Sequence, residues 1–312
     1  MIVSAVCPML LNISIQFDVG VSMSVFKAFL LGLIQGITEF LPVSSSGHMS
    51  LFYHFAGVSG ETAGLFSAML HIGTLVAILV VFYKPIYELF LEFIEVIKDI
   101  IGRRFSFRLS DMSETRRMLF MFIISCVPLL LLLIPVGGGR NLMDLVGAVG
   151  ADDSIRAEGV FFMITGFVLL LGTFTAEATT HFSKIDTSRA VFIGVAQFFA
   201  ACFPGISRSG STISTAMCLR VSKKDAVRYS FILCVPAVLA SGLVEMKDAI
   251  GSTQSISVLP LLVGVVTSAV VGIFGIKLLE ILIKKNLFKY FGYYCLALGF
   301  VVTVIGTAEA FA

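Results

Sequence analysis

The chain has 312 residues, of which 57% are hydrophobic and only 13% are charged, and its mean hydropathy is +1.00. A soluble domain of this size would carry about a quarter charged residues, so the composition excludes an ordinary soluble domain. The apolar stretches are continuous and show no alternation of period two, which excludes a transmembrane β-barrel. We therefore expect an all-α polytopic membrane protein.

The first 22 residues have no basic segment ahead of an apolar one, so they make a poor signal peptide. We expect residues 1–22 to form an N-terminal extension and residues 23–312 to form a single integral membrane domain. Within that domain, six apolar stretches are long enough to cross a bilayer as helices, which takes roughly 20 residues. In chain order they are Leu65–Tyr83, Met118–Val136, Val160–Thr179, Tyr229–Glu245, Val258–Lys277 and Phe291–Ile305.

An internal repeat divides the membrane domain into two halves. GLIQGITEFLPVSSSG at residues 32–47 aligns with GVAQFFAACFPGISRS at residues 194–209 when the chain is shifted by 162 residues, and this shift matches Ser45 with Ser207. Two later pairs of stretches match in the same order, so a duplication is the best interpretation. The repeats extend over about residues 23–180 and about residues 188–308.

The first segment of each half is interrupted by proline, glycine and serine. Pro42 and Pro204 each remove a backbone donor and disfavour helix at the preceding residue. The serines and glycines that follow favour loops and helix N-caps. The helices expected before the prolines, Ser24–Leu41 and Arg189–Phe203, are too short to cross comfortably. We therefore predict two re-entrant helix hairpins in addition to the six transmembrane helices.

Basic residues gather in four polar connections, whereas the other connections are nearly free of positive charge. The four clusters lie at residues 84–117, 184–189, 220–228 and 284–289. With one hairpin and three spans in each half, all four clusters fall on one side, which the positive-inside rule makes cytoplasmic. The repeats then have inverted topology. We interpret the basic clusters as topology signals that can contact membrane lipids, and not as a nucleic-acid site.

The two hairpin loops place polar side chains inside an apolar region. Irregular backbone is tolerated at that depth only where protein covers it or a wet cavity adjoins it, and an ionisable residue there costs about 2.5–3.5 kcal/mol. An ion pair between Glu39 and Arg208 would explain these two charges, but it would not explain the hydroxyls, the histidine and the glycines around them. Hydroxyls and glycines that precede helices are instead typical of an anion site, where backbone N–H groups and a guanidinium bind oxygens. The candidate residues are Glu39, Ser44, Ser45, Ser46, His48, Ser207, Arg208, Ser209, Gly210 and Ser211.

The same loops suggest a reaction. Gln35 lies one helical turn before Glu39, and the pair suits a divalent cation, since magnesium commonly binds one or two carboxylates plus substrate phosphates. His48 and the serines before it supply the nucleophile and proton carrier that covalent phosphoryl transfer needs. The reacting group must arrive on a molecule that lives in the bilayer, as an isoprenoid or glycerolipid diphosphate does.

QGITEFLPVSSSGH at residues 35–48 and PGISRSG at residues 204–210 resemble the two signature motifs of the bacterial undecaprenyl-diphosphate phosphatases, also called bacitracin-resistance proteins. The resemblance runs from about residue 23 to near the C-terminus. It implies a membrane phosphatase domain that converts undecaprenyl diphosphate to the monophosphate carrier of peptidoglycan synthesis. It also implies a reaction on the external side of the bacterial cytoplasmic membrane that depends on magnesium or calcium.

The resemblance also implies roles for individual residues. Gln35 and Glu39 match the metal and diphosphate pair, and the glutamine variant leaves Glu39 as the single carboxylate. We predict that Ser45 attacks with His48 as base, and a histidine nucleophile is the open alternative. The serines Ser44, Ser45 and Ser46 with His48 match the catalytic loop, and Ser207 with Arg208 matches the phosphate-binding loop, which continues through Ser209, Gly210 and Ser211.

Two other functions, a different class of lipid phosphatase and a transporter, share some of these sequence features. Lipid phosphatases that resemble vanadium-type acid phosphatases need a further histidine closely followed by aspartate after the Ser-Arg pair, and no histidine follows His181. A transporter or flippase for a lipid phosphate or anion is compatible with inverted repeats, and it would need Arg208 but no Ser–His pair. Nothing in the sequence indicates the oligomeric state.

Overall fold

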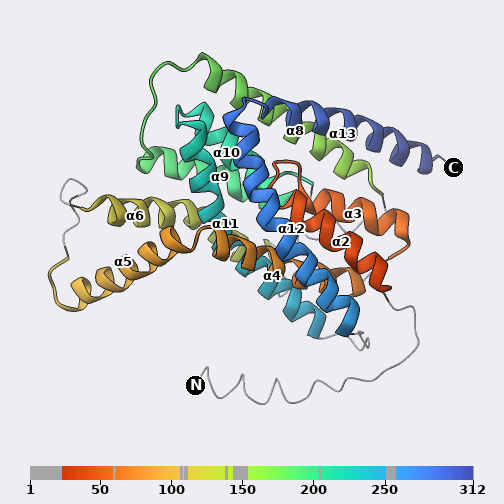
Figure 1. The fold of residues 1–312 in the computed structure, drawn as a ribbon, viewed down its shortest axis with the longest axis horizontal. Helices are drawn as coiled ribbons and strands as arrows, with labels where there is room; N and C mark the ends of the chain where they lie inside the picture. The colour runs from red at the N-terminus through yellow and green to blue at the C-terminus, as the bar shows by residue number, and fades with distance from the viewer. Residues whose placement is uncertain are drawn as a thin grey trace.

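The computed structural model describes residues 23–58, 61–105, 108, 112–137, 140–142, 154–203, 205–250 and 258–311. The expected N-terminal extension and Pro204 lie outside these residues. Helices dominate the described part of the chain, and the expected all-α polytopic fold is confirmed (Figure 1). The exception is a small antiparallel ribbon formed by β1 (Pro135–Gly137) and β2 (Arg140–Asn141).

The two interrupted segments each fold as a pair of helices. At the open end of the pair, opposite the loop, a basic side chain of the first helix donates a hydrogen bond to the end of the second helix. Lys27, in the first turn of its helix, donates through Nζ to the Ala56 carbonyl at 2.9 Å. Arg189 donates through Nε to the Leu219 carbonyl at 2.9 Å. Each bond joins the start of one helix to the end of the next, so each pair returns to the end from which it began. The hairpins are α2 (Val25–Thr38) with α3 (Ser45–Ala56), and α9 (Thr187–Cys202) with α10 (Arg208–Cys218).

Five helices in the described residues are long and apolar enough to cross a membrane, and they correspond to five of the six expected spans. The sixth, Tyr229–Glu245, falls within α11 (Lys223–Ile250), whose 28 residues make it about 42 Å long. This segment of α11 is not one of the five helices. The five are Ala63–Val81 in α4 (Glu61–Val81), Glu114–Leu133 in α6 (Glu114–Cys126) with the 3₁₀-helix η2 (Val127–Leu133), α8 (Arg156–Ala178), α12 (Val258–Lys284) and α13 (Lys289–Glu309).

The segment expected to be a basic connection, residues 84–117, contains a helix that the sequence analysis missed. This helix, α5 (Tyr83–Ile101), follows α4 with one residue between them. Glu92 and Asp99 on α5 bind Arg116 of α6 at 2.6 and 2.8 Å, which holds the two helices together. Charges recur every three to four residues along α5, so it lacks the continuous apolar run by which the spans were found.

The helix directions have the inverted arrangement that was expected. Gly159 of α8 lies against Gly299 of α13, and Gly166 lies against Gly292, so residue numbers rise along one helix as they fall along the other. The last helices of the two repeats therefore pack antiparallel, side by side (Figure 1). A Cβ atom on Gly166 would lie 2.7 Å from the Gly292 carbonyl oxygen, so glycine permits this close approach.

The two repeats are interleaved. In the first hairpin, α2 packs against α12 of repeat two, while α9 of the second hairpin packs against α6 of repeat one. The central spans α4 and α11 also contact each other. This arrangement directs the loops of both hairpins into the interior of the bundle.

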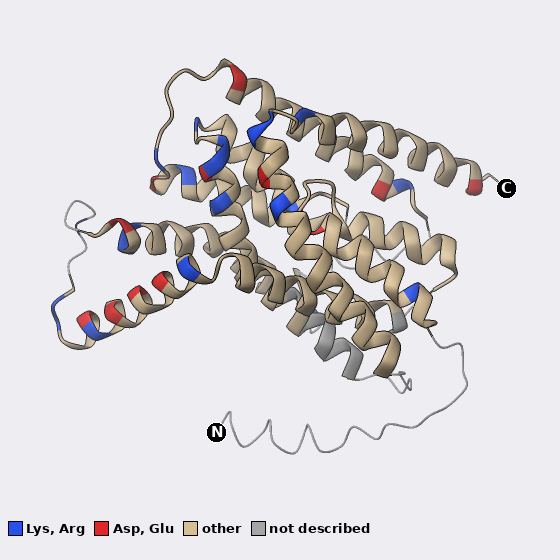
Figure 2. Ribbon diagram, in the orientation of Figure 1, with Lys and Arg blue, Asp and Glu red and all other residues tan. Residues whose placement is uncertain are grey.

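The distribution of charge supports a membrane setting. Figure 2 shows Lys, Arg, Asp and Glu gathered around α5, α6 and the α9–α10 pair, while the middle turns of α8 and α13 carry none. Large apolar side chains point outward from these helices, and Phe167 and Phe300 are 65% and 64% exposed. Helices with apolar outer faces match a lipid environment.

Candidate active site

Glu39 is the centre of the candidate site. It caps the C-terminal end of α2, and its side chain is 1% exposed. Arg208, the first residue of α10, forms an ion pair with Oε1. Ser45, the first residue of α3, donates to Oε2 at 2.7 Å, and Gln35 Nε2 donates to the same oxygen at 3.0 Å. One buried carboxylate thus joins the two hairpin loops, which meet as expected.

Two residues from the central spans complete the surroundings of Glu39. His71 of α4 places Nε2 3.7 Å from Oε2, and its Nδ1 lies 2.9 Å from the Ser67 carbonyl. Cys234 of α11 lies 3.8 Å from Oε1 and 2.8 Å from a guanidinium nitrogen of Arg208. Neither His71 nor Cys234 was among the candidate residues of the sequence analysis. LHIGTLVA at residues 70–77 aligns with LCVPAVLA at residues 233–240 when the chain is shifted by 163 residues, and this match was a signal that the two residues occupy equivalent places.

Serine caps begin the second helix of each hairpin. Ser44 Oγ accepts from the Gly47 N–H at 3.2 Å, and Ser207 Oγ accepts from the Gly210 N–H at 3.0 Å. These bonds satisfy N–H groups that have no partner within a helix. Both predicted phosphate-binding serines therefore lie at helix N-termini, where the helix dipole favours an anion.

The caps correct the alignment of the two repeats. Ser44 and Ser207 are both N-cap residues of the second helix and are 163 residues apart, so the expected equivalence of Ser45 with Ser207 is wrong. The shift increases from 162 to 163 within the loops because the second loop has one residue more between its proline and its capping serine. Ser45 is instead the counterpart of Arg208, and each contacts Glu39 from the first position of its helix.

His48 lies in the first turn of α3 but does not contact Ser45. Its Nδ1 is 2.7 Å from the Ser44 carbonyl oxygen, and its Nε2 is 2.8 Å from the hydroxyl of Tyr294 on α13. The expected pairing of Ser45 with His48 is not seen, because the Ser45 hydroxyl is directed at the carboxylate of Glu39. Sequence reasoning missed Tyr294, which is distant in the chain and belongs to no motif.

The other predicted phosphate-binding residues line the same region. Ser46 Oγ accepts from the Gly205 N–H at 3.2 Å, a direct contact between the two loops. The Ser209 hydroxyl lies 3.4 Å from that of Ser207. Together with Gly210, Ser209 and Ser211 form the buried first turn of α10.

A second buried carboxylate adjoins this region. Glu158, in the first turn of α8, is 3% exposed and accepts from Ser50 of α3 at 2.8 Å. Its other oxygen has no hydrogen-bond partner among the described residues. A Cβ atom on Gly205 would lie 3.4 Å from the Cα atom of Glu158, so this residue borders the second loop. Sequence reasoning missed Glu158, which precedes the expected span.

The donor set limits how a metal could bind. Across the described ranges, no group of three or more His, Cys, Asp and Glu side chains could hold a metal ion. Glu39 supplies a carboxylate that already accepts from Arg208, Ser45 and Gln35. The described residues therefore do not fit a cation enclosed by protein alone, and a cation at Glu39 would take its remaining oxygen ligands from another molecule.

These features define a multi-pass membrane protein with a cluster of polar and charged side chains buried between two opposed helix hairpins. The chain belongs to the family described as bacitracin resistance protein BacA, whose model matches residues 28–301. That match includes both hairpin loops and every residue of the candidate site.

Similar proteins are named as phosphatases. The chain is 35% identical over 291 residues to an undecaprenyl-diphosphatase of Methanosphaera stadtmanae, covering 91% of this chain and 98% of the relative. It is 31% identical over 290 residues to one of Halothermothrix orenii, with coverage of 91% and 98%. It is 34% identical over 277 residues to one of Treponema denticola, with coverage of 89% and 96%.

Proposed function

We propose that this protein hydrolyses undecaprenyl diphosphate to undecaprenyl phosphate and inorganic phosphate. This reaction would recycle the lipid carrier for peptidoglycan synthesis and give bacitracin resistance. The observation that carries the proposal is the contact of one buried carboxylate, Glu39, with both the Ser45 hydroxyl and the Arg208 guanidinium. The names of the relatives support the same substrate.

Ser45 is the proposed nucleophile. Its hydroxyl donates to Glu39 at 2.7 Å, so Glu39 is placed to take the proton as Oγ attacks the terminal phosphorus. The bond from phosphorus to the bridging oxygen breaks, and undecaprenyl phosphate leaves. Arg208 has five N–H donors, so it can bind phosphoryl oxygens while it contacts Glu39.

His48 is the proposed base for the second step. With Nδ1–H donating to the Ser44 carbonyl, Nε2 is left as an acceptor, and it receives the Tyr294 hydroxyl in the free site. A water that replaces this hydroxyl would lose its proton to Nε2 and attack the phosphoserine. Inorganic phosphate would then leave, and the Ser45 hydroxyl would be restored.

A divalent cation, magnesium or calcium, is proposed to bind Glu39 and the Gln35 amide together with the diphosphate of the lipid. When bound, it would supply positive charge to the phosphoryl oxygens. The remaining ligands are not expected from this chain, since the described residues form no larger cluster of ligand side chains.

We also propose that the protein lies in the bacterial cytoplasmic membrane with its active site open to the external side. Within residues 23–58, Lys27 is the only lysine or arginine, and it lies at the open end of the first hairpin, whereas the opposite side carries the dense clusters. By the positive-inside rule, the first hairpin then opens outward.

The test uses purified protein in detergent with a short-chain isoprenoid diphosphate, and phosphate release is measured with and without a chelator. We expect release that needs the cation and is abolished in Ser45→Ala. A phosphorylated enzyme trapped in His48→Ala should be acid-stable, as a phosphoserine is, and an acid-labile adduct would indicate a histidine nucleophile. Binding of the lipid without any phosphate release would instead favour a carrier.

A further inference from the structure

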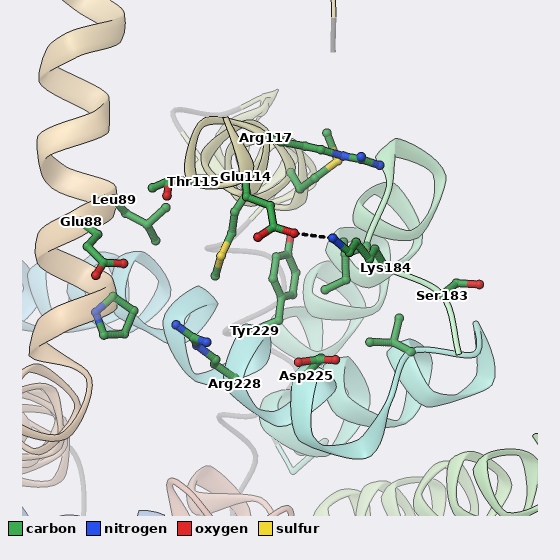
Figure 3. A pocket seen from close by; sticks show the side chains of 15 residues that line it. Glu88, Leu89, Glu114, Thr115, Arg117, Ser183, Lys184, Asp225, Arg228 and Tyr229 are labelled. Carbon is green, nitrogen blue, oxygen red and sulfur yellow. Dashed lines mark hydrogen bonds and ion pairs between the residues drawn. The ribbon is translucent and has the colours of Figure 1, made fainter. Parts of the chain in front are cut away.

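A hollow separate from the candidate active site lies where α5, α6, the link between α8 and α9, and the start of α11 meet (Figure 3). Its volume is about 390 Å³, within the range of small-molecule sites. Both repeats contribute to it, and none of its lining residues belongs to the candidate active site.

The hollow lies where α6 and α11 begin. Glu114 is the first residue of α6, and Asp225 is in the first turn of α11. The charged side chains of the lining are exposed or half-buried and form the rim, while the floor is apolar and consists of the buried Leu89 and Met121 with the half-buried Met118. A charged rim above an apolar floor, at the end of membrane-spanning helices, matches the headgroup region of an amphiphile.

Two of the rim carboxylates have partners within the protein. Glu114 forms an ion pair with Lys184, and Asp225 accepts from the Ser222 hydroxyl at 2.6 Å. These contacts leave neither acid in need of a ligand.

The other charges of the rim are not paired in this way. Among the described residues, no hydrogen bond or ion pair engages the side chain of Arg117, Arg228 or Glu88. Figure 3 shows Arg228 and Glu88 on the side of the hollow away from the Lys184–Glu114 pair. Arg228 and Glu88 thus border the same open space, and the structure shows no ion pair between them.

We propose that this hollow binds the headgroup of an aminophospholipid. Arg228 would donate to the phosphate oxygens, which a guanidinium can bind through two N–H groups. Glu88, which lies on the same side of the hollow as Arg228, would accept from the ammonium group, and the apolar floor would cover the glycerol and the first acyl carbons (Figure 3). A purely anionic headgroup satisfies Arg228 but leaves Glu88 facing like charge, so phosphatidylethanolamine fits better than phosphatidylglycerol.

The chain contains no tryptophan, so Met118→Trp places a single fluorophore in the floor. The full-length variant in detergent is titrated with brominated phosphatidylethanolamine, which quenches tryptophan on contact. We expect saturable quenching and an apparent Kd about tenfold higher when Arg228→Gln is added, as for loss of a charged hydrogen bond. Glu88→Gln should remove the preference over phosphatidylglycerol.

The matched control is Lys284→Gln with Lys285→Gln, which removes positive charge from another polar connection and should leave the Kd unchanged. Native mass spectrometry of the chain without the tryptophan should show one retained aminophospholipid, lost in Arg228→Gln. Equal affinity for phosphatidylglycerol or phosphatidylcholine would overturn the proposal. Displacement of the lipid by inorganic phosphate at similar concentration would overturn it as well, since the site would then recognise free phosphate.

Discussion

The first hairpin, α2 with α3, and the second, α9 with α10, are closed by the same kind of contact and capped by the same kind of serine. Lys27 and Arg189 each donate to the carbonyl at the far end of the hairpin. Ser44 and Ser207 each accept from an N–H in the turn that follows. The duplication has therefore preserved a scaffold, and the functional difference lies in the side chains placed on it.

The two loops differ in backbone strain. Ser44 has φ of 70°, which L-residues rarely adopt, whereas Ser207 has φ of −70°. In the second loop the positive φ belongs to Gly205, at 103°, where no Cβ opposes it. The first loop thus stores strain of about 1–3 kcal/mol at a serine, next to the proposed nucleophile Ser45. Strain of this kind is common where a fold positions reactive groups.

The loops also differ in charge. Gln35 is bonded to Glu39, four residues later, while Gln197 is followed four residues later by Ala201. The Gln197 amide nitrogen is buried and has no partner among the described residues. The first hairpin thus supplies the carboxylate and the second supplies Arg208. A symmetric scaffold has acquired one asymmetric site.

The largest expected effect comes from Glu39→Gln. This change removes the acceptor of the Ser45 proton and the partner of Arg208. Phosphate release should fall about a thousandfold, within the usual range for loss of a general base. The free energy of unfolding should also drop by about 3–5 kcal/mol, because a buried cation loses its partner. The exposed Glu280→Gln on α12 is the control, and near-normal turnover in Glu39→Gln would contradict the assignment.

Arg208→Lys should lower phosphate release about a hundredfold, even though the charge is kept. An ammonium cannot bind two phosphoryl oxygens in the planar geometry of a guanidinium, and removing such a donor typically costs two to three orders of magnitude, about 10²–10³. Arg189→Lys tests the same substitution in the same hairpin away from the site and should keep most of the activity. If both variants lose activity equally, the loss reflects folding of the hairpin.

Ser44→Gly and Ser207→Gly should change stability in opposite directions. Glycine relieves the positive φ at residue 44 and replaces a serine cap at a cost of only a few tenths of a kcal/mol, so a gain of about 1 kcal/mol is expected. At residue 207 there is no strain to relieve, and added backbone entropy should cost about 0.5–1 kcal/mol. Thermal unfolding in detergent measures both, and shifts of the same sign would refute the strain difference.

The smallest effects are expected for the paired glutamines. Gln197→Met removes a buried amide whose nitrogen has no partner among the described residues, so stability should stay unchanged or rise by up to about 1 kcal/mol. Gln35→Met removes a bond to Glu39 and should lower both stability and the apparent affinity for magnesium. A magnesium titration of phosphate release, combined with thermal unfolding, distinguishes the two. Equal losses of stability and magnesium affinity in both variants would show that Gln35 and Gln197 do not differ in their contribution to the site.

Much of the fold and of the site could be read from the sequence because the signals are local. Apolar runs predict spans, proline and serine predict the breaks in the hairpins, and the motifs contain Glu39, Ser45 and Arg208 themselves. The meeting of the two hairpin loops followed from inverted topology, since two opposed hairpins direct their loops to the same depth. The ion pair between Glu39 and Arg208, which the sequence analysis set aside in favour of an anion site, is present in the structure.

Only the tertiary structure decided which groups touch. The hydroxyl of Ser45 faces Glu39, and His48 faces Tyr294, 246 residues away in the chain. Packing of distant helices sets these contacts, and hydrophobic periodicity does not encode them. The expected equivalence of Ser45 with Ser207 was wrong for a related reason. Each residue turns a helix by about 100°, so an alignment error of one residue directs a side chain to a different neighbour. Sequence thus determined which residues enter the membrane interior, and packing determined what each of them contacts there.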